Sequence, residues 1–165
     1  MKRFAITLLC IFTCLSLDAQ NRDIPKDFSF ALTWGTYGIC YYDSQTGVLI
    51  KDSEATDPKV YTTYYSLTDA NTEYVYNLLK ELFTDSYPTI YNPTGEWIQH
   101  PSTTLIITAF WSGKIRIIKA EDICDNIECA DKKGQKFIST CNAISNMLME
   151  TEEWKQLPEL ERFFE

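Results

Sequence analysis

The stretch Thr103–Lys119 reads TTLIITAFWSGKIRIIK and decides the fold. Its first part, Thr103–Trp111, is rich in β-branched and aromatic residues and is apolar on both faces, which predicts a strand inside a sheet. Ser112-Gly113 predicts a two-residue turn, and the isoleucines of Lys114–Lys119 alternate with basic residues, as in a returning strand. Such a hairpin makes its two strands antiparallel neighbours.

Three segments before this hairpin also predict strands. Phe28–Tyr42 alternates apolar and polar side chains, and the two glycines within residues 35–38 predict a bulge that interrupts one long strand. Asp43–Gly47, DSQTG, predicts a hairpin turn that leads into a returning strand at Val48–Ile50. Val60–Tyr65 is again β-branched and aromatic and predicts a third strand.

Two later segments have the periodicity of amphipathic helices. Thr68 or Asp69 predicts the start of the first helix, whose apolar residues recur at i, i+3, i+4 and i+7 up to Leu82. Phe137–Leu148 predicts the second helix, so the element order is β-β-β-α-β-β-α. Because each helix has one apolar stripe to bury, we expect a single α+β domain over residues 28–165. It is a two-layer sandwich of about five antiparallel strands with two helices on one face.

The N-terminus predicts export. Lys2-Arg3 precedes the apolar run Phe4–Leu17 and polar sequence follows, so residues 1–19 predict a cleaved signal peptide. Residues 20–27 then predict a flexible leader. Two competing interpretations are a lipoprotein cut that leaves a lipid anchor at Cys14 and a buried N-terminal helix. The apolar run is itself too short to span a membrane, and no second apolar segment of spanning length follows.

The charge balance narrows the choice of partners. The chain has a formal net charge of −8, and loss of the basic pair and Asp18 with the signal peptide changes this charge to −9. Nucleic-acid binding needs clustered lysine and arginine, so no nucleic-acid partner is expected. An acidic exported protein is instead suited to capturing a basic partner protein through its long-range field.

Four cysteines remain after the signal peptide, and an even count in an exported protein predicts two disulfides. Cys124 and Cys129 lie in an acidic loop, which a bridge between them would pin. Cys40 and Cys141 both point toward the core, so a second bridge would join the sheet to the second helix. Unpaired buried thiols are the alternative for this second pair.

The sequence contains no recognised catalytic or metal-binding motif. His100 is the one histidine and has no serine or cysteine partner at motif spacing, so it is expected to be a plain loop residue. The cysteines and carboxylates of Glu121–Lys133 are ligand types for zinc or calcium, but they lack the spacing of a known site. No cofactor, metal or catalytic residue is therefore predicted. A small secreted hydrolase that uses paired carboxylates stays open as an alternative.

The connection Tyr87–Pro101 is longer than most and contains three prolines. Tyr87, Tyr91 and Trp97 lie in it, and tyrosine and tryptophan are enriched at recognition surfaces. These three residues therefore predict a binding surface, either for a protein partner or for a glycan that stacks on the rings. The alternative is that the rings cover one edge of the sheet.

Two motifs resemble those of a known group. Tyr42–Leu49 reads YDSQTGVL, and Glu153–Pro158 reads EWKQLP after an amphipathic helix. Together they resemble small uncharacterised exported bacterial proteins built as hairpin, strand, helix, hairpin and helix, over residues 28–160. The resemblance implies a bacterial protein of the periplasm or cell exterior. It implies no catalytic residue, because the group has no established activity.

These observations lead to one functional expectation. We expect an exported binding or interaction protein of the cell envelope, of immunity or inhibitor type, whose partner is an unknown protein or glycan. Its small size, the aromatic loop and the lack of a catalytic set support this expectation. The alternatives are the carboxylate hydrolase and a glycan-binding accessory protein.

Overall fold

The computed structural model describes residues 24–95, 100–124 and 126–160. The expected signal peptide and Cys14 lie outside these residues, and so does Trp97 of the expected binding loop. No helix in the described ranges has the length and apolar content needed to cross a bilayer.

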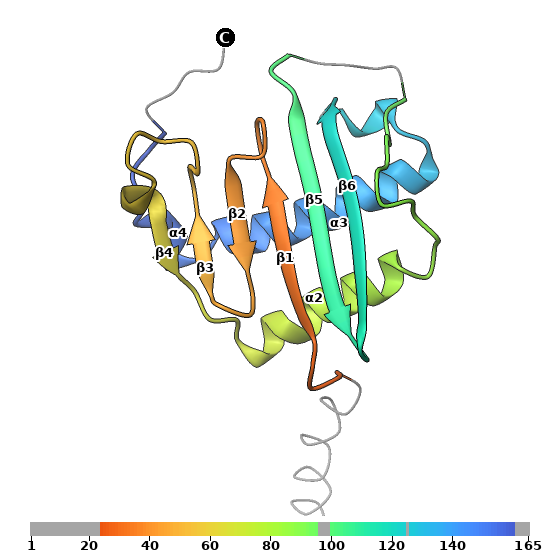
Figure 1. Ribbon diagram of the computed structural model, residues 1–165, viewed down its shortest axis with the longest axis horizontal. Coiled ribbons are helices and arrows are strands. Elements are labelled where there is room, and N and C mark those ends of the chain that lie inside the picture. The colour runs from red at the N-terminus through yellow and green to blue at the C-terminus, as the bar shows by residue number, and fades with distance from the viewer. Residues whose placement is uncertain (1–23, 96–99, 125, 161–165) are drawn as a thin grey trace, which may run out of the picture.

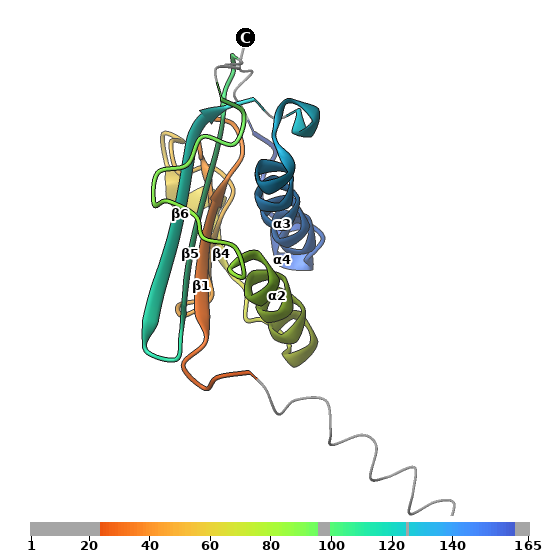
Figure 2. The ribbon, with the colours of Figure 1, turned by 90° about the vertical axis from the view of Figure 1, so that its right-hand side faces the viewer.

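The described residues form one six-stranded antiparallel sheet with helices packed on one face (Figure 1 and Figure 2). The strand order across the sheet is β4-β3-β2-β1-β5-β6. The strands are β1 (Ser29–Trp34), β2 (Cys40–Asp43), β3 (Val48–Ile50), β4 (Thr62–Tyr64), β5 (Thr103–Trp111) and β6 (Lys114–Ile123). The helices are α2 (Asp69–Leu82), α3 (Lys132–Met149) and α4 (Glu152–Lys155), with 3-10 turns η1 (Pro58–Tyr61) and η2 (Ile127–Cys129). The predicted α+β two-layer sandwich is confirmed, with the short helix α4 in addition to the two expected helices.

The chain reverses between Gly35 and Gly38 and does not form the expected bulge. Trp34 lies opposite Cys40 in an antiparallel pair, so the predicted long strand is in fact two strands, β1 and β2. Gly35 and Gly38 have φ angles of 86° and 73°, a region that glycine enters without steric cost. A Cβ atom on Gly38 would lie 3.0 Å from a methyl carbon of Thr104. Glycine at this position therefore permits both the turn and the close approach of β5.

The core lies between the sheet and the helices. Val75, Leu79 and Leu82 of α2 are fully buried, as the predicted apolar stripe requires. Thr68 caps this helix, because its Oγ1 accepts the Asn71 N–H at 3.1 Å. The opposing strand positions are equally buried, and the sheet contributes Leu32, Tyr42, Leu49, Ile107 and Ile118, all fully inaccessible.

Helix α3 starts inside the segment that we expected to be a loop. Asp131 is its N-cap, and its Oδ1 accepts the Gly134 N–H at 2.7 Å. A Cβ atom on Gly134 would lie 2.8 Å from the Pro93 carbonyl oxygen, so glycine allows the preceding loop to cross this turn closely. Phe137 follows on the buried face of the helix. The cap and the crossing loop together fix where α3 begins.

The end of the expected flexible leader is tied to the sheet. Ile24 packs against the core, and the Asp27 carboxylate accepts the N–H groups of Ser112 at 3.0 Å and Gly113 at 2.9 Å. Ser112 and Gly113 form the β5–β6 turn, so Asp27 stabilises that turn from a distant part of the chain. The hydrogen bond from Gly113, followed by the one from Ser112, keeps the pKa of Asp27 below its ordinary value.

We predict that Ile107→Asp unfolds the protein and that Ile106→Asp does not. Ile107 is 0% exposed beneath the helices, so a carboxylate there would be buried without a partner and would cost more than about 4 kcal/mol. Ile106 faces the other side of the sheet, where the same change would cost about 1 kcal/mol. Urea unfolding followed by circular dichroism measures both. The reverse result would mean that the β5 register is shifted by one residue.

We also predict a pH-dependent contribution of Asp27 to stability. A carboxyl whose folded-state pKa is lowered stabilises the fold above its unfolded-state pKa, about 3.9, and this effect is lost as the pH falls through the folded-state pKa. The stability difference between the wild type and Asp27→Asn should therefore be present at neutral pH and shrink on acidification. A carboxyl titration by NMR gives the pKa directly, and a value at or above the ordinary one would contradict the prediction.

Candidate functional site

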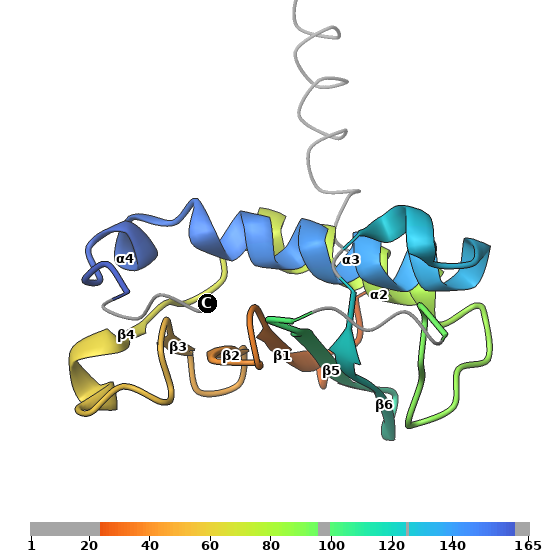
Figure 3. The same cartoon turned by 90° about the horizontal axis from the view of Figure 1, so that it is seen from above.

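One face of the sheet carries no helix in the described part of the chain. Helices α2, α3 and α4 all lie on the same side of the sheet in two perpendicular views (Figure 2 and Figure 3). Successive side chains on a strand point to opposite faces, so the strand register assigns each residue to one side. Ala31, for example, lies between Asp43 of β2 and Thr108 of β5, and all three remain partly exposed.

A short segment extends this uncovered side past β6. The Tyr91 N–H donates to the Lys119 carbonyl oxygen at 2.8 Å, and the Lys119 N–H donates to the Thr89 carbonyl oxygen at 2.7 Å. Residues 89–91 therefore pair in parallel with the outer edge of β6. Ile90 lies opposite Lys119 in this bridge, on the same side of the sheet, and is 82% exposed.

We name the outward-facing side chains of the six described strands, together with Ile90, the open face. Its apolar and aromatic members are Ala31, Tyr41, Val48, Ile50, Tyr64, Ile90, Ile106, Phe110, Ile115 and Ile117. Its hydroxyl-bearing members are Ser29, Thr33, Thr62, Thr104 and Thr108. Its charged members are Asp43, Lys119 and Glu121, the last of which follows the inward-facing Ala120 on β6.

The apolar content of the open face is high for a sheet surface in contact with water. An antiparallel sheet that is covered on one side normally alternates apolar residues inward with polar residues outward. Here Ile115 is 66% exposed and Tyr64 is 70% exposed. Contiguous apolar patches on a soluble domain usually mark a surface that binds something. The open face is therefore the candidate functional site.

The open face is hollowed over β1. A cavity of about 440 Å³ lies between Tyr41 on β2 and Phe110 on β5, above the small side chains of Ser29 and Ala31. The larger neighbours on both sides enclose space that the small residues of β1 leave unfilled. Asp43 contributes the one carboxylate of the lining, and both of its oxygens already accept hydrogen bonds within the β2–β3 turn. The hollow suits an apolar side chain better than a polar ligand.

The open face carries few charges, two acidic residues and one basic residue, although the chain as a whole has a formal net charge of −8. Desolvation, and secondarily the charge of Asp43, raises the pKa of Tyr41, so its hydroxyl is uncharged at neutral pH. Asp43 and Lys119 have opposite charges and lie on β2 and β6, with β1 and β5 between them. A partner of this face therefore meets mainly apolar surface at the centre, with Asp43 toward one flank and Lys119 and Glu121 toward the other.

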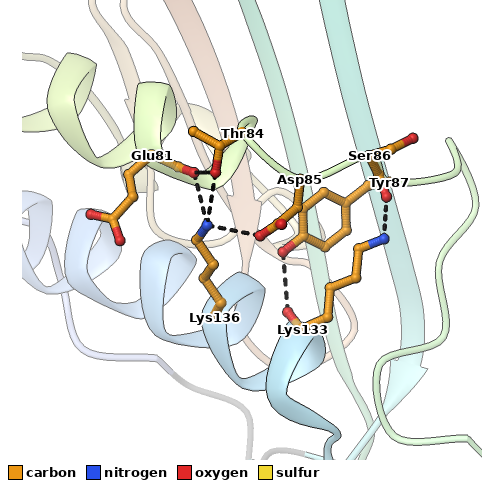
Figure 4. Close-up of polar contacts among 7 residues, drawn as sticks. All are labelled: Glu81, Thr84, Asp85, Ser86, Tyr87, Lys133 and Lys136. Atoms are coloured by element: carbon orange, nitrogen blue, oxygen red, sulfur yellow. Dashed lines mark hydrogen bonds and ion pairs between the residues drawn. The ribbon is translucent and has the colours of Figure 1, made fainter.

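The expected binding loop is held against the joint between α2 and α3, which Figure 4 shows. Lys136 Nζ donates to the Glu81 carbonyl oxygen at 2.8 Å and forms an ion pair with Asp85 Oδ2 at 2.8 Å. One turn earlier, Lys133 Nζ donates to the Ser86 carbonyl oxygen. Two lysines of α3 thus satisfy carbonyl groups at and beyond the end of α2.

Tyr87 and Tyr91 pack against the core from this loop. Their rings lie 5.3 Å apart edge to face, and they lie 6.2 Å and 5.9 Å from the ring of Phe137. Tyr87 Oη donates to the Lys133 carbonyl oxygen at 3.1 Å, and Tyr91 Oη lies 3.3 Å from Asp131 Oδ1. Desolvation is the main cause that raises the pKa of each hydroxyl to about 12. Both rings have a structural explanation, and the binding role of Tyr87, Tyr91 and Trp97 stays a prediction.

The described cysteines form no disulfide in the structure. The expected Cys40–Cys141 bridge is absent, although both residues belong to the same core. Cys40 Sγ instead donates to the Lys51 carbonyl oxygen at 3.3 Å, and Cys141 is fully buried on α3. Burial raises the pKa of both thiols, to about 12 for Cys40, so both stay protonated in this structure.

The expected Cys124–Cys129 bridge is also not formed in the structure. The two sulfur atoms lie 3.9 Å apart, a thiol–thiol contact well beyond the bond length of about 2.05 Å. The bridge remains a prediction for oxidising conditions.

The acidic residues near these cysteines have local structural roles. Asp122 Oδ1 accepts the Ser102 hydroxyl at 2.9 Å, and Asp131 caps α3. The described residues contain no group of three or more histidine, cysteine or acidic side chains that could hold a metal ion. Each of the three described cavities has at most one carboxylate in its lining, so none of them supports the carboxylate hydrolase. His100 is an exposed loop residue beyond the strands.

Comparisons with known protein families, curated proteins and solved structures gave no match. The resemblance based on Tyr42–Leu49 and Glu153–Pro158 stays an expectation, and both motifs have structural explanations. The first is the β2–β3 hairpin. In the second, Trp154 stacks on Trp34 with ring centroids 5.6 Å apart, and Leu157 is buried.

Sequence reasoning missed the open face, although a signal was present. The stretch Thr103–Trp111 is apolar on both faces, and we took this pattern only as a sign of a strand inside the sheet. The strand does lie between β1 and β6, but its second apolar face has no cover from the described chain. Ile106 and Phe110 are the residues that carried this signal. The small side chains that form the hollow gave no sequence signal, because they leave a hollow only when larger side chains lie beside them on the neighbouring strands.

We predict that Tyr91→Ala lowers the free energy of unfolding by about 1–2 kcal/mol and that Tyr91→Phe lowers it much less. The reason is that the ring packs on Tyr87 and Phe137, whereas the hydroxyl makes one long contact at the surface. Urea unfolding measures both variants. Unchanged stability in Tyr91→Ala would show that the ring is not needed for packing and would favour the binding role expected from the sequence.

Proposed function

We propose that the protein is an exported, non-catalytic interaction protein of the cell envelope that binds a protein partner through the open face. The observation that carries this proposal is the uncovered apolar side of the sheet, where Ile115 is 66% exposed. The signal-peptide pattern of residues 1–19 supports export.

The chemistry of the open face favours a protein over a small polar ligand. Its polar members are mostly hydroxyl groups spread along separate strands, and they do not converge on one point. Small-ligand pockets instead combine apolar walls with a few converging polar groups. The apolar side chains cover several strands, which is the arrangement of a protein–protein interface with an apolar centre.

The immunity- or inhibitor-type form of this function is compatible with the charge distribution. The open face supplies apolar contact, and the rest of the molecule carries the excess of acidic residues. In this form, the field of the whole molecule would speed the approach of a basic partner, and the open face would make the lasting contact.

Site-specific photo-crosslinking in the native envelope tests the proposal. A photoreactive aromatic residue replaces Ile115 on the open face or, as a matched control, Tyr74 on α2, which is 45% exposed. We expect a discrete crosslinked protein from position 115 and none from position 74, because the contact is on the sheet side. Equal crosslinking at both positions, or none at position 115, would contradict the proposal.

A further inference from the structure

The two middle strands of the open face differ in side-chain size. Strand β1 presents Ser29, Ala31 and Thr33, and the residues paired with them on β5 are Phe110, Thr108 and Ile106. The large and small side chains therefore lie in adjacent rows, with the hollow over β1 and a ridge over β5. A surface with a groove beside a matching ridge can pack on a copy of itself.

We infer that the partner on the open face is a second copy of this chain, packed face to face about a two-fold axis along the boundary between β1 and β5. This inference rests on the proposed function and names its partner, which takes the place of the immunity- or inhibitor-type partner on that face. Rotation about that axis lays β5 of one copy over β1 of the other, as two-fold interfaces require. Phe110 of each copy then lies over Ser29 of the other and enters its hollow, and Ile106 lies over Thr33.

The same axis places opposite charges near each other. It carries β6 of one copy over β2 of the other, so Lys119 lies over Tyr41, with Asp43 further along the same strand. A lysine side chain can contact an aromatic ring by a cation–π interaction and still reach a neighbouring carboxylate. The one further charge on the open face, Glu121, lies beyond Lys119 on the side away from Asp43, so this axis does not place the two acids over each other.

The size of the open face is sufficient for a stable dimer. The axis opposes β3, β2, β1, β5, β6 and residues 89–91 and leaves β4 outside the contact; at about 4.8 Å between strands and about 3.3 Å per residue these give a flat area on the order of 500 Å². A standard interface takes about 800 Å² of accessible surface from each partner, and side-chain relief adds to the flat area. Two sheets packed in this way keep their strand directions within about 30° of each other, so the rows stay roughly in register.

A size-exchange cycle tests the pairing of ridge and hollow. Sedimentation velocity over a dilution series gives the dimer dissociation constant of the purified protein, and we expect the wild type to reach the mass of two chains. Phe110→Ser leaves the hollow empty and Ser29→Phe fills it, so each should weaken the dimer by about tenfold or more. The combined variant exchanges ridge and hollow and should recover most of the affinity, which independent sites would not do.

A charge variant tests the flanks of the same interface. Lys119→Glu should weaken the dimer because it places an acid near Asp43 of the other copy. Lys132→Glu makes an equal charge change at an exposed position on α3 and should change the dimer dissociation constant less. Circular dichroism checks that each variant is folded, and the charge pair keeps the inference testable if a size variant fails to fold.

The outcomes separate this inference from the proposed function. A monomeric wild type that still crosslinks at position 115 to a different protein overturns the second-copy inference and leaves the proposed function in place. A monomer with no crosslink at position 115 overturns both. A dimer that is unaffected by the size exchange and by Lys119→Glu associates through another surface, which also overturns the inference.

Discussion

The antiparallel pairing of β1 with β5 is the interaction on which the rest of the structure depends. It joins two units that are far apart in the chain, the β1–β4 meander and the β5–β6 hairpin, into one sheet. Helix α2 lies between these units in sequence, and both α2 and α3 contribute to the core behind them. Asp27 strengthens the connection at one end by capping the β5–β6 turn. Without this pairing, neither unit would have enough covered surface to be stable alone.

Much of the fold follows from local patterns. The apolar stripe of α2, the cap at Thr68 and the hairpin at Ser112-Gly113 are each set by residues close in sequence, and the structure has all three. The reversal between Gly35 and Gly38 was missed, because glycines at positive φ suit a bulge as well as a turn. Whether the glycines form a bulge or a turn depends on the pairing of β1 with β5, which local sequence does not specify.

The candidate site was harder to predict for the same reason. Aromatic density drew attention to Tyr87 and Tyr91, but a ring on a loop can pack inward or outward, and Phe137 provides an inward contact for both. The cysteine count predicted bridges, but Cys40 and Cys141 are buried in the structure without a disulfide. Which face of the sheet stays open depends on the face against which the helices pack. That packing is determined by all the buried residues together. The sequence shows which side chains of a strand share a face. Tertiary packing determines which of the two faces stays exposed.

The bridge between residues 89–91 and β6 also limits how molecules of this kind can assemble. A free strand edge offers unpaired N–H and carbonyl groups to another chain and is a starting point for open-ended fibre growth. Here main-chain hydrogen bonds on both sides of Lys119 occupy part of the β6 edge, and at the other end of the sheet β4 is only three residues long. Neither edge offers a long template for polymerisation. Edge-to-edge growth into a filament is therefore disfavoured, because one edge is interrupted and the other is short.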